Sequence, residues 1–111
     1  MTEPTIDATT FAELQDAAGS DFVAELVGTF VEEAPRMLAE LRSSHAGPNP
    51  DAFRRAAHSL KSNAHTFGAT RLASLARQLE LGGLLTDTAP LDSLEAEYRK
   101  VAAALQELRN G

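Results

Sequence analysis

Apolar residues recur every three or four positions along most of this 111-residue chain. That spacing places them on one face of an α-helix, so the pattern predicts a series of amphipathic helices. No segment alternates apolar and polar residues with a period of two, so no sheet is expected. Glycine, proline and asparagine separate the periodic segments and mark where helices begin and end. The helices are predicted at about residues 10–18, 20–44, 50–67, 69–82 and 90–109.

Several residues are expected to start a helix or to disturb one. Ser20 is expected to cap the second helix, because its hydroxyl can accept a hydrogen bond from a free backbone N–H. Asn49 followed by Pro50 predicts the start of the third helix, with the asparagine as cap. Pro35 lies within the second helix and removes one backbone hydrogen bond, so a kink is expected there unless the helix is interrupted.

Four long helices with short connections predict an all-α fold, an antiparallel up-down-up-down four-helix bundle. The short first helix is expected to lie across one end of this bundle. Because a chain of this length supports one core, residues 1–111 are expected to form a single domain. The long apolar faces are all needed inside that core, so we expect a monomer.

Composition excludes several classes of site and of protein. The chain has no cysteine, which rules out disulfides, thiolate nucleophiles and cysteine-ligated metals. Its N-terminus has neither a basic region nor an apolar run, so no signal peptide is expected. No apolar run approaches the roughly 18 residues that a membrane span needs. We therefore expect a cytoplasmic protein that does not enter a membrane.

The charge of the chain is unevenly distributed. The formal net charge is −6, from 16 acidic and 10 basic residues. An acidic chain repels a nucleic-acid backbone, so binding to DNA or RNA is not expected. Between Asp51 and Arg71, however, four basic residues and one acidic residue give +3, which leaves −9 for the rest. This positive segment contains His58 and His65.

His58 is predicted to point away from the core. At about 100° per residue, the large apolar residues of the third helix fall on the side opposite His58. The residues that share its face are Arg54, Lys61, Ser62 and His65. A buried structural role for His58 is therefore not expected.

A metal site is also not expected at the two histidines. Helical histidines that share one ion are three or four residues apart, whereas His58 and His65 are seven apart, about 10.5 Å along the axis. Cationic neighbours would repel a metal ion. Hydrolytic catalysis is poorly supported as well, because the chain has no nucleophile elbow, phosphate loop or dinucleotide fingerprint.

An exposed imidazole with a lysine one turn away remains. Neutral imidazole is nucleophilic near pH 7, since its pKa is about 6.5. A phosphoryl group on His58 would be negatively charged, and Lys61 and Arg54 could approach that charge from the same face. This arrangement is typical of a histidine that accepts a phosphoryl group and passes it on.

Around these residues the sequence resembles the histidine-containing phosphotransfer (HPt) family of multistep phosphorelays. The motif is His-Ser-Leu-Lys from His58 to Lys61, with Gly68 ten residues after the histidine. The predicted order of helices resembles the family over nearly the whole chain. Three further segments share the resemblance, namely residues 30–35, 54–57 and 68–72.

The resemblance implies that His58 is the phosphorylated residue, by family analogy at Nε2, and that Lys61 supports the phosphoryl group. The implied partners are response-regulator receiver domains and hybrid or sensor histidine kinases. Magnesium would belong to the receiver's aspartate pocket, so no cofactor or metal is expected on this chain. The protein would relay phosphate without independent catalytic activity.

Five residues are candidates for contact with a partner. Ser62 stands where many family members have glycine, and its hydroxyl could bond the phosphoryl group or narrow the choice of partner. His65 is more simply a solvated histidine, and helix termination alone explains Gly68. Arg54 and Arg55 are explained equally well as solvated helix residues and as contacts to a partner. The five candidates are Arg54, Arg55, Ser62, His65 and Gly68.

Two alternatives stay open at this stage. A degenerate bundle could bind a receiver or kinase as an adaptor or inhibitor, without being phosphorylated, although Lys61 would then be unnecessary. The chain could also be a module of a larger hybrid kinase. Met1 and the short tail after Leu108 favour an independent protein.

Overall fold

The computed structural model describes residues 4–83 and 87–110, and within these ranges every regular element is an α-helix. The all-α prediction is confirmed, and the predicted helix bounds differ from the observed ones by at most two residues. The predicted connection after Gly83 falls partly on residues 84–86, which lie outside the described residues. The helices are α1 (Ala8–Ala18), α2 (Ser20–Ala46), α3 (Pro50–Thr66), α4 (Thr70–Gly82) and α5 (Ala89–Asn110).

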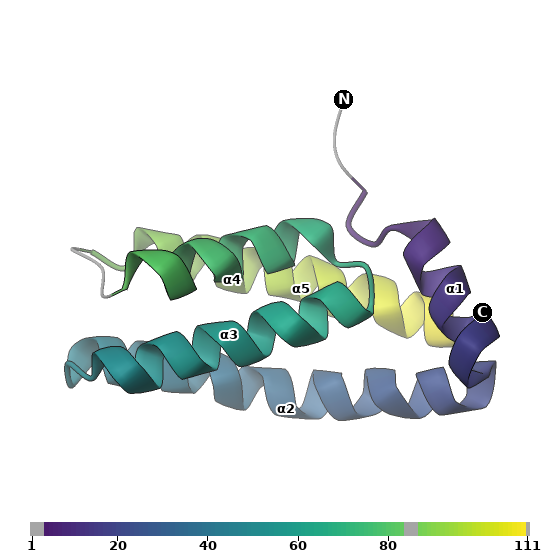
Figure 1. Ribbon diagram of the computed structural model, residues 1–111, viewed down its shortest axis with the longest axis horizontal. Coiled ribbons are helices and arrows are strands. Elements are labelled where there is room, and N and C mark those ends of the chain that lie inside the picture. The colour runs from purple at the N-terminus through teal and green to yellow at the C-terminus, as the bar shows by residue number, and fades with distance from the viewer. Residues whose placement is uncertain (1–3, 84–86, 111) are drawn as a thin grey trace.

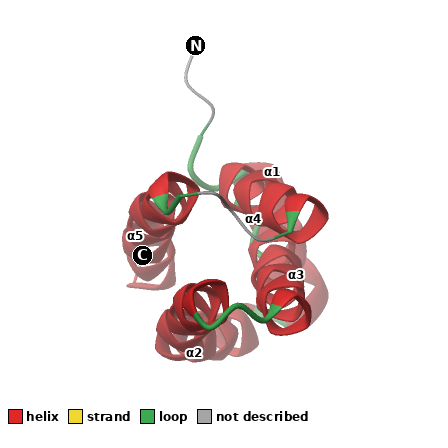
Figure 2. Cartoon of the chain, turned by 90° about the vertical axis from the view of Figure 1, so that its left-hand side faces the viewer, coloured by secondary structure: helices red, strands yellow, loops and turns green. Residues whose placement is uncertain are grey.

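Helices α2 to α5 form the up-down-up-down bundle, and α1 lies across the end where α2 begins and α5 finishes (Figures 1 and 2). The start of α1 is capped by Asp7, whose Oδ1 accepts a hydrogen bond from the backbone N–H of Thr9 at 3.0 Å. In the same way Asn49 Oδ1 accepts from the N–H of Ala52 at 3.1 Å, which confirms the predicted start of α3.

The predicted capping role of Ser20 is wrong. Ser20 is the first residue of α2, and no side-chain hydrogen bond caps this helix. Gly19 alone connects α1 to α2, with φ of +92°, a conformation that glycine adopts without steric cost. Its N–H donates to the carbonyl of Gln15 and its own carbonyl accepts from the N–H of Val23. One glycine therefore ends α1 and begins α2, which leaves no position for a separate capping residue.

Pro35 does not interrupt α2, which continues from Ser20 to Ala46. Because proline has no N–H, the carbonyl of Val31 lacks its usual donor four residues later. The hydroxyl of Tyr98 on α5 donates to that carbonyl at 3.3 Å. Burial raises the pKa of Tyr98, so the hydroxyl keeps the proton that it donates. The bundle thus replaces the missing helical bond with one between helices.

Tyr98→Phe is expected to lower the free energy of unfolding by about 1 kcal/mol, because it removes the donor and leaves the Val31 carbonyl unsatisfied. In a Pro35→Ala background, residue 35 has an N–H for that carbonyl, so the same substitution should cost clearly less. Urea unfolding of the four proteins in this double-mutant cycle measures the difference. An equal cost in both backgrounds would show that the two groups are not coupled.

The core fixes the orientation of α3, the helix that contains His58. Phe53, Leu60 and Ala64 are completely buried on one side of this helix. Full burial of a side chain as large as Phe or Leu stabilises a protein by about 1.5–3 kcal/mol. Phe67, just after α3, packs against Phe30 of α2 with ring centroids 5.4 Å apart. The opposite side of α3 is therefore held toward solvent.

Candidate functional site

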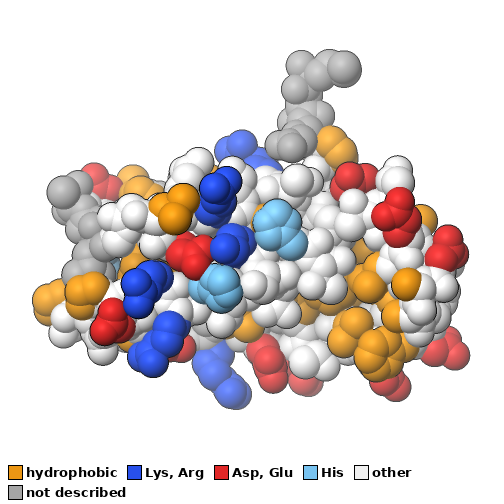
Figure 3. Space-filling model, viewed as in Figure 1, with side chains coloured by type: hydrophobic (Ala, Val, Ile, Leu, Met, Phe, Trp, Pro, Cys, Tyr) orange, Lys and Arg blue, Asp and Glu red, His pale blue; other side chains and the backbone are white. Residues whose placement is uncertain are grey.

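His58 lies on the outer surface of α3, and 59% of its side chain is exposed. The predicted outward orientation is confirmed, because the neighbouring Leu60 is fully buried on the other side of the helix. Figure 3 shows two histidine side chains on the surface, beside a group of Lys and Arg side chains.

The imidazole is held by a residue that the sequence reading did not single out, Glu80 of α4. His58 Nδ1 lies 2.6 Å from Glu80 Oε2, and Lys61 Nζ donates to Glu80 Oε1, also at 2.6 Å. One carboxylate thus binds both His58 and Lys61, and only 16% of its side chain is exposed. Two hydrogen bonds lower the pKa of Glu80: the one from Lys61 has the larger effect, and the one from His58 the next largest. Glu80 is therefore ionised at neutral pH.

This contact determines which ring nitrogen of His58 is left free. An ionised carboxylate can only accept hydrogen bonds, so the proton between the two groups belongs to Nδ1. In the neutral imidazole the other nitrogen, Nε2, then has the free lone pair. Because Nδ1 is occupied by Glu80, Nε2 is the nitrogen available for attack on an incoming group. Lys61 is one turn further along α3, and its ammonium group lies beside the site, bonded to Glu80.

The candidate docking residues differ in how the structure presents them. Arg54 is paired with Asp51 across 3.5 Å, and both side chains are largely exposed. Such a surface pair contributes little to stability. Arg55 is exposed and has no ion pair among the described residues. Ser62 and His65 are exposed on the same side of α3 as His58, and the structure does not connect the His65 side chain to Glu80.

Gly68 is buried, so it does not itself offer a surface to a partner. It has φ of +78° and follows the end of α3. Its carbonyl accepts a hydrogen bond from the N–H of Asp7 at 2.8 Å. A Cβ atom at this position would lie 3.0 Å from the Asp7 carbonyl oxygen and 3.0 Å from Thr10 Cβ. Gly68 therefore turns the chain between α3 and α4 and lets the start of α1 pack closely.

Gly68→Ala is expected to lower the free energy of unfolding by about 1–3 kcal/mol, because alanine strains a positive φ and its Cβ meets the Asp7 carbonyl and the Thr10 side chain. Gly82→Ala is the matched control, since a Cβ there has nothing within 4 Å. That control should be neutral or stabilising by up to about 1 kcal/mol. Chemical denaturation measures both, and an equal effect at the two positions would contradict this account.

The described residues hold no group of three histidine, aspartate or glutamate side chains arranged to bind a metal ion. In residues 4–83 and 87–110 no helix combines the length and the apolar character needed to cross a membrane.

The fold is thus a helical bundle, and the imidazole of His58 lies exposed on one of its helix faces. The family model described as Hpt domain matches residues 25–111, and the chain belongs to this family. The fold is similar to the crystal structure of histidine-containing phosphotransfer protein B (HptB) from Pseudomonas aeruginosa PAO1. The similarity has a TM-score of 0.89 and 26% sequence identity, and it covers 98% of this chain and 97% of that one. No curated protein matches the chain.

Membership of this family establishes histidine phosphotransfer within a two-component relay as the function. Hpt domains are phosphoryl carriers rather than catalysts, and their partners are two-component proteins such as receiver domains and kinases. The alternative of a non-phosphorylated adaptor or inhibitor is not favoured.

Proposed function

We propose that His58 accepts the phosphoryl group at Nε2 and exchanges it with the phosphorylated aspartate of receiver domains. The observation that carries this proposal is the position of Glu80. Its carboxylate lies 2.6 Å from Nδ1 and so directs the free lone pair of the imidazole to the exposed nitrogen. His65, the other histidine of α3, has no such carboxylate contact among the ion pairs and hydrogen bonds of the described residues.

The transfer step is a direct displacement at phosphorus. The Nε2 lone pair forms a P–N bond while the P–O bond to the receiver aspartate breaks, and the aspartate leaves as a carboxylate. The imidazole becomes positively charged as the bond forms, and the ionised Glu80 beside Nδ1 stabilises that charge. In the reverse direction the same contacts hold the phosphorylated ring while the receiver carboxylate attacks.

Lys61 supports the phosphoryl group by its charge. Its Nζ is bonded to Glu80 at 2.6 Å, and 21% of its side chain is exposed. Its flexible stem lets the ammonium move toward a phosphoryl group on the neighbouring turn. Since Glu80 is also bonded to His58, the lysine remains next to the reacting ring throughout.

The protein supplies the nucleophile His58 and the charged groups beside it, Lys61 and Glu80. The receiver supplies the aspartate and its acidic pocket. Magnesium belongs to the acidic pocket of the receiver, and the chain acts as a cytoplasmic monomer without catalytic activity of its own. The basic residues around His58 complement that acidic pocket electrostatically and disfavour contact with other cationic surfaces. Its net charge of −6 makes nucleic acid an unfavourable partner.

A transfer assay with purified receiver domains from the same organism tests this function. A labelled, phosphorylated receiver should pass its label to this protein within minutes, and the product should be stable in base and labile in acid, as a phosphoramidate is. Peptide mapping should place the label on the segment that contains His58. Label that is stable in acid, or a stable complex without transfer, would contradict the proposal.

A further inference from the structure

Two adjoining hollows run along the surface between α2 and α5. The larger, of about 620 Å³, lies over Ala24 and Gly28 of α2. The smaller, of about 220 Å³, lies between α1, the start of α2 and the end of α5, and Phe11 and Val23 are among the residues that line it. Ala24 and Arg109 line both hollows, so the two form one continuous groove. It is called the α2–α5 groove below.

The α2–α5 groove lies on the side of the bundle away from His58. In the end view of Figure 2, α2 and α5 lie together on one side, and α3 and α4 lie on the other. His58 and its carboxylate partner Glu80 belong to α3 and α4. A molecule bound in the α2–α5 groove therefore leaves the face that contains His58 uncovered.

The α2 side of the groove has a line of carboxylates. At about 100° per residue, Asp21, Glu25 and Glu32 lie within about 40° of one another around α2. All three are exposed and line the groove, and none has an ion pair among the described residues. Asp21 and Glu25 are four residues apart, a spacing at which like charges destabilise a helix. A cation bound in the groove would relieve this repulsion.

Gly28, in the middle of α2, gives the groove its depth. Glycine within a helix costs stability relative to alanine. A Cβ atom at Gly28 would meet only the flexible end of Arg109, with Nη1 at 3.1 Å and Cζ at 3.8 Å. Packing against α5 therefore does not require glycine here, and a position that breaks a local rule in this way is typical of a functional site.

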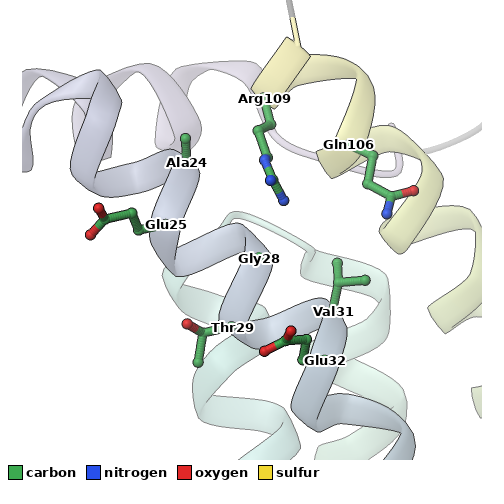
Figure 4. A pocket seen from close by; sticks show the side chains of 8 residues that line it. All are labelled: Ala24, Glu25, Gly28, Thr29, Val31, Glu32, Gln106 and Arg109. Carbon is green, nitrogen blue, oxygen red and sulfur yellow. The ribbon is translucent and has the colours of Figure 1, made fainter.

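The space above Gly28 already accepts a cationic side chain. Arg109 extends from α5 across the groove toward α2, and its guanidinium lies over Gly28 (Figure 4). Arg109 is exposed and has no ion pair in the part of the chain that the structure describes. Because nothing in that part fixes the guanidinium by charge, a cation from another molecule can replace it.

We propose that the α2–α5 groove binds a basic amphipathic segment of a partner protein. An arginine or lysine of that segment occupies the space over Gly28 and pairs with Glu25 and Glu32, while Arg109 moves toward solvent. One turn along the segment, an apolar side chain enters the smaller hollow, beside Leu108, which is 43% exposed. A cavity of about 150 Å³ is enough to hold a benzene ring, so this hollow admits leucine or phenylalanine.

Charge disfavours two other occupants. A second copy of the chain that met the groove with its own groove would bring the same line of carboxylates to the interface. Anionic ligands and lipid headgroups would be repelled by that line as well. A basic partner is attracted instead, because the chain outside residues 51–71 carries a formal charge of −9.

The test measures binding of a fluorescein-labelled amphipathic peptide, with leucine on one helix face and arginine on the other, by fluorescence anisotropy. We expect saturable binding to the full chain that weakens as salt is added. Glu25→Gln combined with Glu32→Gln should raise the Kd about tenfold. Glu33→Gln combined with Glu40→Gln is the matched control, because it removes the same charge from exposed positions of α2 outside the groove. The control should stay within about twofold of the wild-type Kd.

Gly28→Leu separates binding from stability. Leucine is a good helix former, so urea unfolding of this variant should occur at the wild-type concentration or above. Its side chain fills the space over α2, so the Kd for the peptide should rise about tenfold or more. In ¹⁵N NMR spectra of the wild-type protein, the peptide should shift the amide signals of α2 and of the end of α5 most.

Three results would overturn the groove as a site for a basic segment. The first is the absence of saturable binding, or wild-type binding by Gly28→Leu. The second is an equal loss in the two double variants, or amide shifts centred on α3. The third is a dimer in analytical ultracentrifugation that is lost in Gly28→Leu, because the groove would then be occupied by a second copy. None of these results bears on phosphoryl transfer at His58, which the assay with receiver domains tests separately.

Discussion

Replacing His58 by glutamine is expected to abolish acid-labile phosphoryl uptake from every donor. Glutamine is similar in length and can remain hydrogen-bonded to Glu80, but its amide nitrogen has no lone pair available for attack on phosphorus. Phosphoryl uptake should therefore fall below the detection limit at every donor concentration, which a weaker affinity for the donor would not produce. Labelling with a phosphorylated receiver and, separately, with phosphoramidate measures it.

His65→Gln is the matched control for this experiment. His65 is exposed on the same side of α3, seven residues away, but has no contact with Glu80. The control should retain full uptake from phosphoramidate, which requires no docking. If the label persists in His58→Gln and disappears in His65→Gln, the assignment of the two histidines is reversed.

Glu80→Ala is expected to slow phosphoryl uptake by about 10- to 100-fold, the usual cost of removing a carboxylate that orients a reactive histidine. Without the carboxylate, the imidazole samples both tautomers and several orientations, and the positive charge that develops during transfer has no counter-ion. The reduction should appear in the rate with phosphoramidate as well as with a receiver, because the reacting ring itself is affected.

Two further variants separate the parts of this effect. Glu80→Gln keeps an oxygen that can accept from Nδ1 but removes the charge, so its rate should lie between those of Glu80→Ala and the wild type. Lys61→Ala leaves the contact between His58 and Glu80 in place, so it should slow uptake less, by about tenfold. A wild-type rate in Glu80→Ala would show that the carboxylate does not control the reactive nitrogen.

The fold could be predicted from the sequence because each helix shows its buried face in its own apolar periodicity. The outward direction of His58 followed from the same regularity, since Leu60 and Ala64 of α3 fix the opposite side. These properties depend on residues close together in the chain. The position of His58 relative to Lys61 could be predicted for the same reason.

Contacts between helices could not be predicted in this way. Glu80 is 22 residues after His58 and belongs to another helix, so no local spacing connects the two. Tyr98 and the carbonyl freed by Pro35 are still further apart, 67 residues from Val31 to Tyr98. The wrong prediction of Ser20 as a cap has a local cause. The sequence does not show that a single residue, Gly19, ends one helix and begins the next. The sequence offers one indication of the role of Glu80. This acidic residue directly follows Leu79, which belongs to the buried face of α4, so it lies next to the core and close to a neighbouring helix.

Nitrogen–phosphorus NMR can test most directly whether Glu80 directs phosphorylation to Nε2 of His58. The protein is labelled with ¹⁵N in its histidine rings and phosphorylated with phosphoramidate. We predict one phosphorylated ring, assigned to His58, with phosphorus coupled to Nε2 and the proton kept on Nδ1. Phosphorus on Nδ1 of His58, or on the ring of His45 or His65, would contradict the account.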